Sequence, residues 1–539
     1  MQARRCGVHW CLRKERCAKC KVGNLANHDV TFGFRVGMGA HMVEFRFNHR
    51  CDNLQCEPLK LLWLNPILEM RMPTAILPMI DGVKVVVPDS LNLITPYVLC
   101  EQQDWFEDEI KFLRHLLQPG HKVIDIGANY GVYTLSMAKT VGSTGCVWAF
   151  EPASSTANLL AEGIAMNGFA QVTLEQSALS SARGTAQLSL NQNSELNALI
   201  HDQLSTNASE TVPLVTLDDC METYGWRDIE FVKIDAEGEE ANILKGGERF
   251  FSELSPLIQY EVKAGTDLHL ELVQDFASFG YDSYRLVPGL NLLVPFNVQS
   301  QPDGYLLNLF CCKPDRAALL ASRSFLLDSA GLSTGKERLK DLSEKIRGRN
   351  AYDWSHNLAK LPYGALLAKP WEKTMATGLS GDVDEALSFY AICRDSSLSA
   401  AERFCALEAS FSCFKILCDR QSSHLRLASL ARVARDYGAR TLAVNALTHL
   451  SNTILKSSQM DPSEPFLVPD ERFDSVPPGE PLGNWILAAV LEALERFGSF
   501  SSFYTGDSAR KRLEIIRDLG FGSAEMQRRL NMLQQRFGS

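Results

Sequence analysis

Between residues 122 and 263, short apolar strands alternate regularly with helices, an order that few folds accommodate. The predicted helical segments separate most of the strands and include 155–168 and 239–254. A helix between consecutive strands leaves those strands parallel, so the order predicts a parallel sheet with helices on both faces. The predicted strands are KVIDIG (122–127), CVWAFEP (146–152), VTLEQSAL (172–179), IEFVKIDAEG (229–238) and LIQYEVK (257–263).

Further segments extend this region at both ends. A β-branched run (84–89) and an amphipathic helix (104–117) precede the first strand. The runs at 281–287 and 304–313 have no helix between them, so they should close the sheet as an antiparallel hairpin. The predicted fold class is therefore a doubly wound, mostly parallel, Rossmann-like α/β sheet.

At 539 residues the chain is too long for one hydrophobic core, and several domains are expected. Strand patterns end near residue 314, and from residue 379 onward helical patterns dominate. Small residues at the expected helix crossings suggest stacked hairpins like tetratricopeptide repeats, although no clean period of about 34 residues is present. The predicted parts are a leader (1–60), lead-in strands and helix (61–118), the α/β domain (119–315), a linker (316–378) and an α-helical domain (379–539).

Charge and hydropathy bear on partners and location. The net charge of −10 provides no basic surface for nucleic acid. The most apolar stretch (59–80) is interrupted by charges and prolines, so it should not span a membrane. The basic N-terminus lacks the apolar stretch of a secretory signal. We expect a cytoplasmic protein without a transmembrane segment or a nucleic-acid partner.

The leader is rich in cysteine, arginine and lysine. Cys17 and Cys20 have the spacing of one half of a zinc site, but Cys6 and Cys11 are five residues apart and do not supply the second half. We expect a poorly ordered leader without metal and, in a reducing cytosol, no disulfide framework.

The segment VIDIGANYGVYTLSMA (123–138) leads from a strand through a glycine turn into a helix. Ligands of open parallel sheets bind at such turns. A dinucleotide site needs a glycine where Asn129 stands, because the backbone must touch the pyrophosphate. S-adenosylmethionine has no phosphates, so it tolerates Asn129 between Gly127 and Gly131. Asp125 can order the turn and face the cofactor's ammonium group.

Acidic and small residues on the next strands extend this candidate site. Glu151 lies 20 residues past Gly131, where an acid accepts two hydrogen bonds from an adenosine ribose. It suits NAD as well as S-adenosylmethionine, and a surface glutamate after a tight turn is the alternative. Ser177 and Ala178 end the third strand, where topology alone places the adenine.

Three charged residues alternate with apolar ones in FVKIDAEG (231–238). Strand pleating would put Lys233, Asp235 and Glu237 on one side. Charges at the end of a buried strand must be paired or line a site, so a purely structural Lys233–Asp235 pair is the alternative to a catalytic cluster. Glu261 on the following strand can join them, whereas His269 is expected on a helix surface.

Four stretches resemble the FkbM family of S-adenosylmethionine-dependent methyltransferases: DIGANYGVYTLSMA, AFEPA, TLDD (216–219) and FVKIDAEGEEANILKGG. The resemblance covers about residues 95–313, and KIDAEGEE is its most specific element. It implies a class I methyltransferase fold that acts on a hydroxyl of a sugar, polyketide or similar metabolite. It also favours a site rather than a structural pair at Asp235. Residues 1–60 and the chain beyond 313 lie outside it.

The leading hypothesis is therefore O-methyl transfer to a small-molecule or glycan acceptor. Asp235 would be the base or acceptor anchor, supported by Glu237 and oriented by Lys233, with no obligatory metal. A divalent metal between the two carboxylates is the alternative, and C- or N-methylation stays open.

Two other classes of function remain. Asn129 disfavours an NAD-dependent oxidoreductase. The intact glycine turn and Glu151 disfavour an interaction protein built on a degenerate methyltransferase domain. The helices of 379–539 would bind a protein partner or a carrier-linked substrate.

Overall fold

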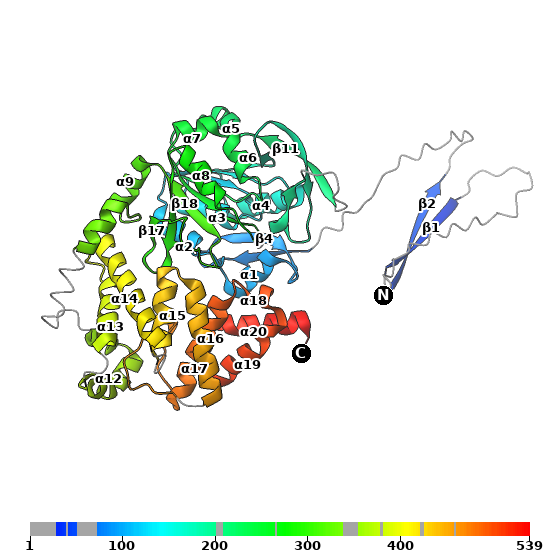
Figure 1. The fold of residues 1–539 in the computed structure, drawn as a ribbon. Coiled ribbons are helices and arrows are strands. Elements are labelled where there is room, and N and C mark those ends of the chain that lie inside the picture. The colour runs from blue at the N-terminus through cyan, green and yellow to red at the C-terminus, as the bar shows by residue number, and fades with distance from the viewer. Residues whose placement is uncertain are drawn as a thin grey trace, which may run out of the picture. The chain divides into compact units, whose positions relative to one another are not determined.

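The computed structural model describes residues 29–38, 41–50, 73–200, 208–264, 267–337, 354–377, 381–420, 425–457 and 460–538 (Figure 1). The chain forms two compact units, residues 1–71 and 72–539. In the first unit, β1 (Asp29–Met38) pairs antiparallel with β2 (His41–Arg50), which the sequence patterns did not predict. The leader cysteines considered for zinc lie outside the described residues.

The second unit is built around a sheet with the strand order β17-β16-β18-β13-β12-β5-β6-β7. The strands from β13 to β7 are parallel, and β18, β16 and β17 each run antiparallel to their neighbours. This confirms the predicted doubly wound, mostly parallel sheet. The strands are β5 (Lys122–Ile126), β6 (Cys146–Phe150), β7 (Val172–Glu175), β12 (Phe231–Ile234), β13 (Leu257–Glu261), β16 (Asp282–Val287), β17 (Leu292–Pro295) and β18 (Asn308–Cys312).

The antiparallel end of the sheet differs in one respect from the expectation. β16 and β18 pair antiparallel as predicted, but β17 lies between them in the sequence. It folds back on the outer side of β16 through the 3₁₀ turn Pro288–Leu290. The predicted simple hairpin is therefore a three-stranded antiparallel end.

Two predicted elements are each divided into two. The predicted strand 172–179 ends at Glu175, and β8 (Ala178–Leu179) pairs with β11 (Ser209–Val215) in a second sheet. That sheet also contains β9 (Gly184–Ser189) and β10 (Ala198–Leu199). The predicted helix 239–254 is interrupted at Gly246, where a Cβ atom would lie 2.1 Å from the carbonyl oxygen of Ser180. The chain there packs too closely for any side chain.

Alternate residues of the central strands enter two hydrophobic clusters, one on each face. Val123 and Phe231 pack under α3, whereas their neighbours Ile124 and Val232 pack under α7. The helices of this region are α1 (Ile94–Gln102), α2 (Asp108–Leu116), α3 (Val132–Val141), α4 (Ser154–Asn167), α5 (Leu217–Tyr224), α6 (Glu240–Lys245), α7 (Glu248–Glu253) and α8 (Glu271–Ser278). The hairpin β3 (Thr74–Pro78) and β4 (Lys84–Pro88) precedes them.

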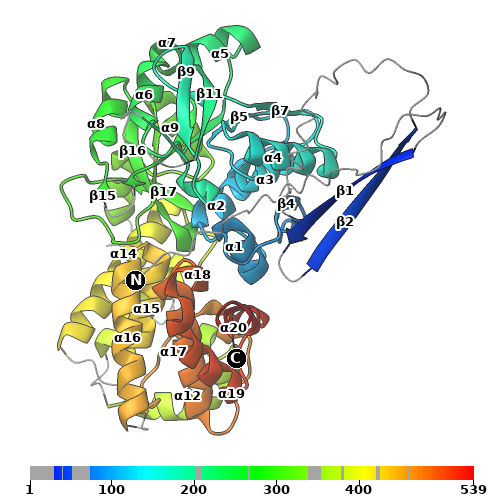
Figure 2. The same ribbon diagram turned by 90° about the vertical axis from the view of Figure 1, so that its right-hand side faces the viewer.

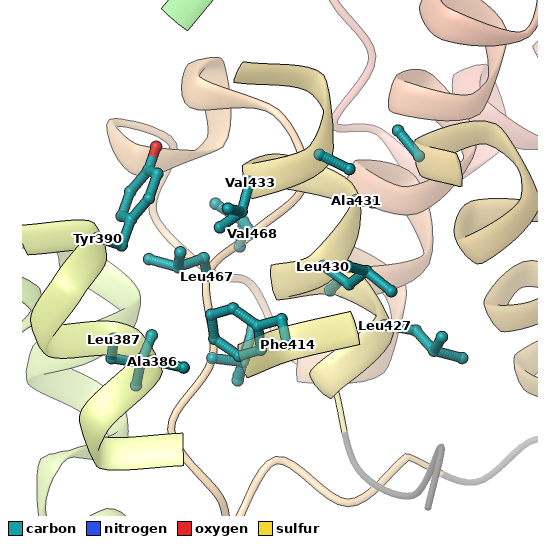
Figure 3. Close-up of a cluster of buried hydrophobic side chains, with 14 of the residues drawn as sticks. Ala386, Leu387, Tyr390, Phe414, Leu427, Leu430, Ala431, Val433, Leu467 and Val468 are labelled. Atoms are coloured by element: carbon teal, nitrogen blue, oxygen red, sulfur yellow. The ribbon is translucent and has the colours of Figure 1, made fainter. Parts of the chain in front are cut away.

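Beyond Cys312 the described residues form helices and no named strand, as expected. Consecutive helices pack on one another, and the irregular stretch before α17 contributes Leu467 and Val468 to their core (Figure 3). The repeat-like arrangement stays a prediction. The helices are α9 (Pro314–Ser322), α11 (Trp354–Leu358), α12 (Pro362–Met375), α13 (Gly381–Cys393), α14 (Ala400–Arg420), α15 (Arg426–Tyr437), α16 (Arg440–Ser457), α17 (Leu482–Gly498), α18 (Ser502–Thr505), α19 (Arg510–Leu519) and α20 (Ala524–Phe537).

The helical region shares its core with the sheet. Val287 and Leu292 of the antiparallel end belong to the same hydrophobic cluster as α13 to α17. Arg285 in β16 donates a hydrogen bond of 2.7 Å to the carbonyl oxygen of Tyr437 at the end of α15. The boundaries proposed at 316 and 379 stay predictions, but the parts on either side pack as one unit.

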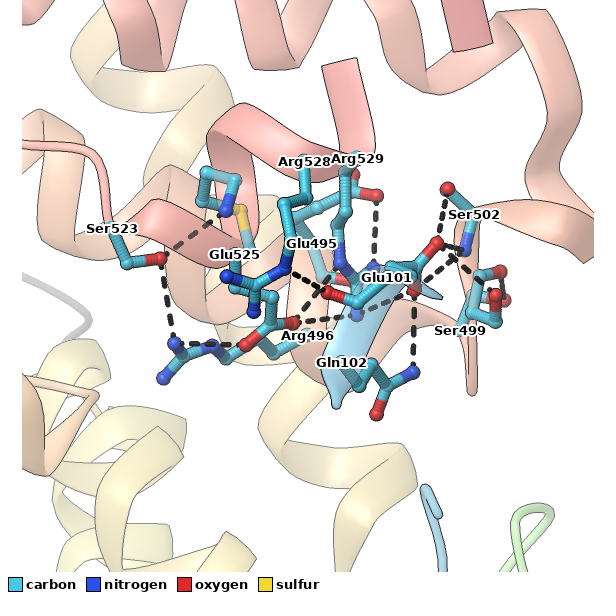
Figure 4. Close-up of polar contacts among 12 residues, drawn as sticks. Glu101, Gln102, Glu495, Arg496, Ser499, Ser502, Ser523, Glu525, Arg528 and Arg529 are labelled. Atoms are coloured by element: carbon cyan, nitrogen blue, oxygen red, sulfur yellow. Dashed lines mark hydrogen bonds and ion pairs between the residues drawn. The ribbon is translucent and has the colours of Figure 1, made fainter. Parts of the chain in front are cut away.

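α1 lies beside α18 and α20 (Figure 2), and a buried polar network joins it to the last helices (Figure 4). Arg529 in α20 lies 3.2 Å from the carboxylate of Glu101 in α1 and 3.3 Å from that of Glu495 in α17. All three side chains are buried, and Glu101 also accepts hydrogen bonds from Ser501 and Ser502. Buried charges are tolerated only when paired in this way.

Within the described residues, no helix is both long and apolar enough to cross a membrane.

Candidate functional site

The glycine turn after β5 lies at the carboxyl end of the parallel strands. Gly127, Asn129 and Gly131 have φ values of 78°, 49° and 85°, in the left-handed region. A Cβ atom on Gly127 would lie 1.7 Å from the carbonyl oxygen of Asp235. Glycine is required here because the turns after β5 and β12 touch.

Glu151, at the end of β6, is tied to the same turn. Its carboxylate accepts hydrogen bonds of 2.9 Å from the backbone N–H groups of Asn129 and Ala153. Burial raises the pKa of Glu151 to about 7. The residue therefore holds the turn in place and keeps further acceptor positions for a ligand.

Two buried polar atoms nearby, Oδ1 of Asp125 and Oγ of Ser177, have no hydrogen-bond partner among the residues that the structure describes. The other carboxylate oxygen of Asp125 accepts a hydrogen bond of 2.5 Å from Thr134. Burial raises the pKa of Asp125. Because buried polar atoms are normally paired, these two atoms indicate a ligand that supplies the missing partners.

Lys233 and Asp235 form a close ion pair beside this turn. The ammonium nitrogen lies 2.6 Å from the Asp235 carboxylate and 4.9 Å from the centre of the Tyr133 ring. Burial lowers the pKa of Lys233, but the carboxylates of Asp235, Asp125 and Glu107 raise it by more. Lys233 therefore stays charged and orients the acids around it.

Two more acids complete a cluster. Single carboxylate oxygens of Asp235, Glu237 and Glu261 lie within 4.8 Å of one another. Burial and then the neighbouring carboxylates raise the pKa of Glu237 to about 8 and that of Glu261 to about 11. Strand pleating does not place Glu237: β12 ends at Ile234, and Glu237 adopts a φ of 47° in the turn that follows.

A cavity of about 550 Å³ brings these residues together. Gly131 is the one predicted cofactor residue that does not line it, because its Cα packs against Leu160 of α4. His269 was expected on a helix surface, but it lies just before α8, half-exposed, with its Nδ1 2.7 Å from the carboxylate of Glu271. The predicted site residues that line the cavity are Asp125, Gly127, Asn129, Glu151, Ser177, Ala178, Lys233, Asp235, Glu237 and Glu261.

The cavity also has walls that the sequence reasoning missed. Glu107, just before α2, accepts a hydrogen bond of 2.5 Å from Tyr133 and one of 3.3 Å from Asn308. It lies in the predicted helix 104–117, none of whose residues was proposed for the site. Phe500 and Tyr504, from the C-terminal region, line the cavity as well, and no sequence signal indicated them.

Residues 125–283 match the family model of the methyltransferase FkbM domain. This segment is an FkbM methyltransferase domain. The match contains the glycine turn, Glu151 and the carboxylate cluster. Glu107, Phe500 and Tyr504 lie outside the FkbM domain, so other parts of the chain complete its cavity.

Several solved structures are similar to part of this chain. A methyltransferase FkbM from Methylobacillus flagellatus KT is 18% identical, with 36% of this chain and 43% of that chain covered and a TM-score of 0.25. An S-adenosylmethionine-dependent O-methyltransferase from Thermotoga maritima is 15% identical, with 45% and 78% covered and a TM-score of 0.23. One from Aquifex aeolicus, described as an S-adenosylmethionine-dependent methyltransferase, is 16% identical, with 40% and 92% covered and a TM-score of 0.24. No curated protein matches the chain.

Proposed function

We propose that this protein is an S-adenosylmethionine-dependent methyltransferase that methylates a hydroxyl oxygen of a sugar, a glycan or a related metabolite. The observation that carries the proposal is the placement of three carboxylates and a buried lysine in the same cavity as the glycine turn of an FkbM domain. One end of that cavity suits a nucleoside, and the other suits an acceptor that must lose a proton.

The cavity residues fit the cofactor. Glu151 would accept the ribose hydroxyls, and the unpartnered oxygen of Asp125 would face the ammonium group. Ser177 and Ala178 would adjoin the adenine, with Ser177 Oγ free to bond it. When bound, S-adenosylmethionine supplies an electrophilic methyl group. NAD fits less well, because the Asn129 side chain stands where a pyrophosphate needs bare backbone.

The carboxylate cluster would prepare the acceptor. A hydroxyl is a weak nucleophile until its proton begins to leave, and a positioned base typically contributes ~10²–10⁴-fold. Asp235 would accept that proton or anchor the hydroxyl, and Lys233 holds its carboxylate in place at 2.6 Å. Glu237 would support Asp235 from the neighbouring turn.

The same geometry supports a second mode of action. Three carboxylate oxygens within 4.8 Å of one another are a plausible set of ligands for a divalent cation, which would lower the pKa of the acceptor hydroxyl. We propose that no metal is obligatory, because Lys233 already supplies a positive charge to Asp235. Activity that disappears with EDTA and returns with Mg²⁺ would favour the metal instead.

Calorimetric titration of the full chain with S-adenosylhomocysteine and with NAD tests the cofactor assignment. We expect saturable binding of S-adenosylhomocysteine and none of NAD. The reverse preference would indicate an oxidoreductase, and binding of neither would favour a domain without cofactor. Transfer of a tritiated methyl group to a panel of glycosides then tests the reaction, with base-stable label on oxygen as the expected product.

A further inference from the structure

A second cavity of about 450 Å³ adjoins the cofactor cavity. It lies between α2, the loop before β18 and the helices α15 to α17. The two cavities share part of their walls, namely Phe106, Glu107, Leu307, Asn308 and Phe500. A molecule that occupies the acceptor end of the first cavity can therefore extend toward the second.

Aromatic rings and a half-buried arginine form one wall of the second cavity. The guanidinium of Arg440 lies 4.6 Å from the centre of the Tyr305 ring and 4.5 Å from that of Phe500. It donates hydrogen bonds to the carbonyl oxygens of Phe497 and Arg496, and within the described part of the chain it forms no ion pair. Burial lowers the pKa of Arg440. A guanidinium has five N–H donors, so those that these two hydrogen bonds do not use can donate to a ligand.

Glu109 in α2 lines the same cavity. Among the residues described, its side chain has no ion pair and no hydrogen bond to another residue. Burial, followed by the carboxylates of Glu107 and Asp108, raises the pKa of Glu109 to about 8. At neutral pH this carboxyl can both donate and accept a hydrogen bond.

The charges around the cavity restrict the chemistry of its occupant. An anionic group would meet the carboxylates of Asp108 and Asp470, and a cationic group would meet the guanidinium groups of Arg435 and Arg440. A neutral ligand with many hydroxyl groups satisfies both sets, because each hydroxyl donates to a carboxyl and accepts from a guanidinium. The ring of Tyr305 adds an apolar surface for the C–H face of such a ligand.

We infer that the second cavity is a subsite for a neutral oligosaccharide: the sugar to be methylated enters the first cavity, and the adjoining sugar binds between Glu109 and the Arg440–Tyr305 wall. This inference rests on the proposed function, since it assigns the acceptor of that same reaction. It makes the C-terminal helices part of acceptor selection.

Binding of tagged glycans to the full chain, loaded with S-adenosylhomocysteine, tests the subsite. The probes are neutral monosaccharides, trisaccharides of the same sugars, and sulfated counterparts of both. We expect at least one neutral trisaccharide to bind at least ~10-fold more tightly than its monosaccharide and than its sulfated form. Glu109→Ala should abolish the preference for the trisaccharide, whereas Glu109→Gln, which still donates and accepts hydrogen bonds, should keep most of it.

Three outcomes would each overturn the subsite. They are equal binding of monosaccharides and trisaccharides, a preference for the sulfated forms, and binding of no neutral glycan. The same titrations separate this failure from that of the proposed function, because S-adenosylhomocysteine binding is measured independently. An equal effect of Glu109→Ala on monosaccharide and trisaccharide would also contradict the inference, since it would indicate general damage to the fold.

Discussion

Asp235 is the residue on which the proposed chemistry depends. Asp235→Asn keeps the shape of the side chain but removes the charge that would accept the acceptor proton and pair with Lys233. We expect turnover to fall by ~10²-fold or more, with S-adenosylhomocysteine affinity within a few-fold of wild type. Steady-state kinetics measure the turnover, and calorimetry measures the S-adenosylhomocysteine affinity. Asp219→Asn, at a carboxylate that pairs with the exposed Arg183, is the control. Unchanged turnover would make Asp235 structural.

Glu151 gives cofactor binding a pH dependence. Its pKa of about 7 means that the carboxylate is mostly protonated at pH 6 and mostly ionised at pH 8. Since the ionised form is the stronger acceptor for ribose hydroxyls, S-adenosylhomocysteine affinity should rise with pH across this interval, by up to ~10-fold. Calorimetry at several pH values measures it. Glu151→Gln should bind more weakly at pH 8 and lose most of the dependence; a variant that keeps it would assign the titration to another group.

At the scale of elements, the contact between the turns after β5 and β12 holds the site together. Gly127→Ala would place a methyl group 1.7 Å from the Asp235 carbonyl at a φ of 78°, so the two turns must separate. Overpacking of this kind costs ~1–3 kcal/mol, so both the melting temperature and S-adenosylhomocysteine binding should fall. Gly184→Ala, with no atom within 4 Å of its Cβ, is the matched control. Wild-type affinity in Gly127→Ala would show that the turns are independent of the cofactor site.

The elements also show what the sequence can predict. The parallel strands and the acids at their ends were predictable, because buried strands leave period and composition signals and their carboxyl ends meet at one edge. The break after Glu175 could not be predicted. Ala178 and Leu179 are apolar, as residues of a continuing strand would be, but they pair with β11 in the second sheet. The position of Glu237 was missed because pleating was extended past the end of β12. Such breaks depend on tertiary contacts far apart in the sequence.

At the scale of the whole molecule, the buried network of Arg529 joins α1, which precedes the FkbM domain, to the last helices. Arg529→Met would leave Glu101 buried without its cation, at a cost of ~3–5 kcal/mol, whereas Glu495 would keep its ion pair with Arg512. We expect a lower melting temperature and a single calorimetric transition in both wild type and variant, because one core spans the two regions. Arg517→Met removes an exposed ion pair with Asp518, and it should change neither the melting temperature nor the number of transitions. Two separate transitions in the wild type would show that residues 379–539 fold independently.

The residues that the C-terminal region contributes to the cavities could not be predicted from the sequence. Phe500 and Tyr504 line the cavity of the FkbM domain although they lie 217 and 221 residues beyond its end at residue 283, and no local pattern marks a residue that completes a distant site. The helical region could be predicted as helical from its periodicity, but its packing against β16 and β17 could not, because apolar faces do not specify their partners.

The crystal structure of the full chain with S-adenosylhomocysteine tests the central claim most directly. The account predicts the nucleoside in the cavity beside the glycine turn, with both ribose hydroxyls within hydrogen-bonding distance of Glu151 and the sulfur facing Asp235. A nucleoside bound outside this cavity, or one whose ribose makes no contact with Glu151, would contradict it.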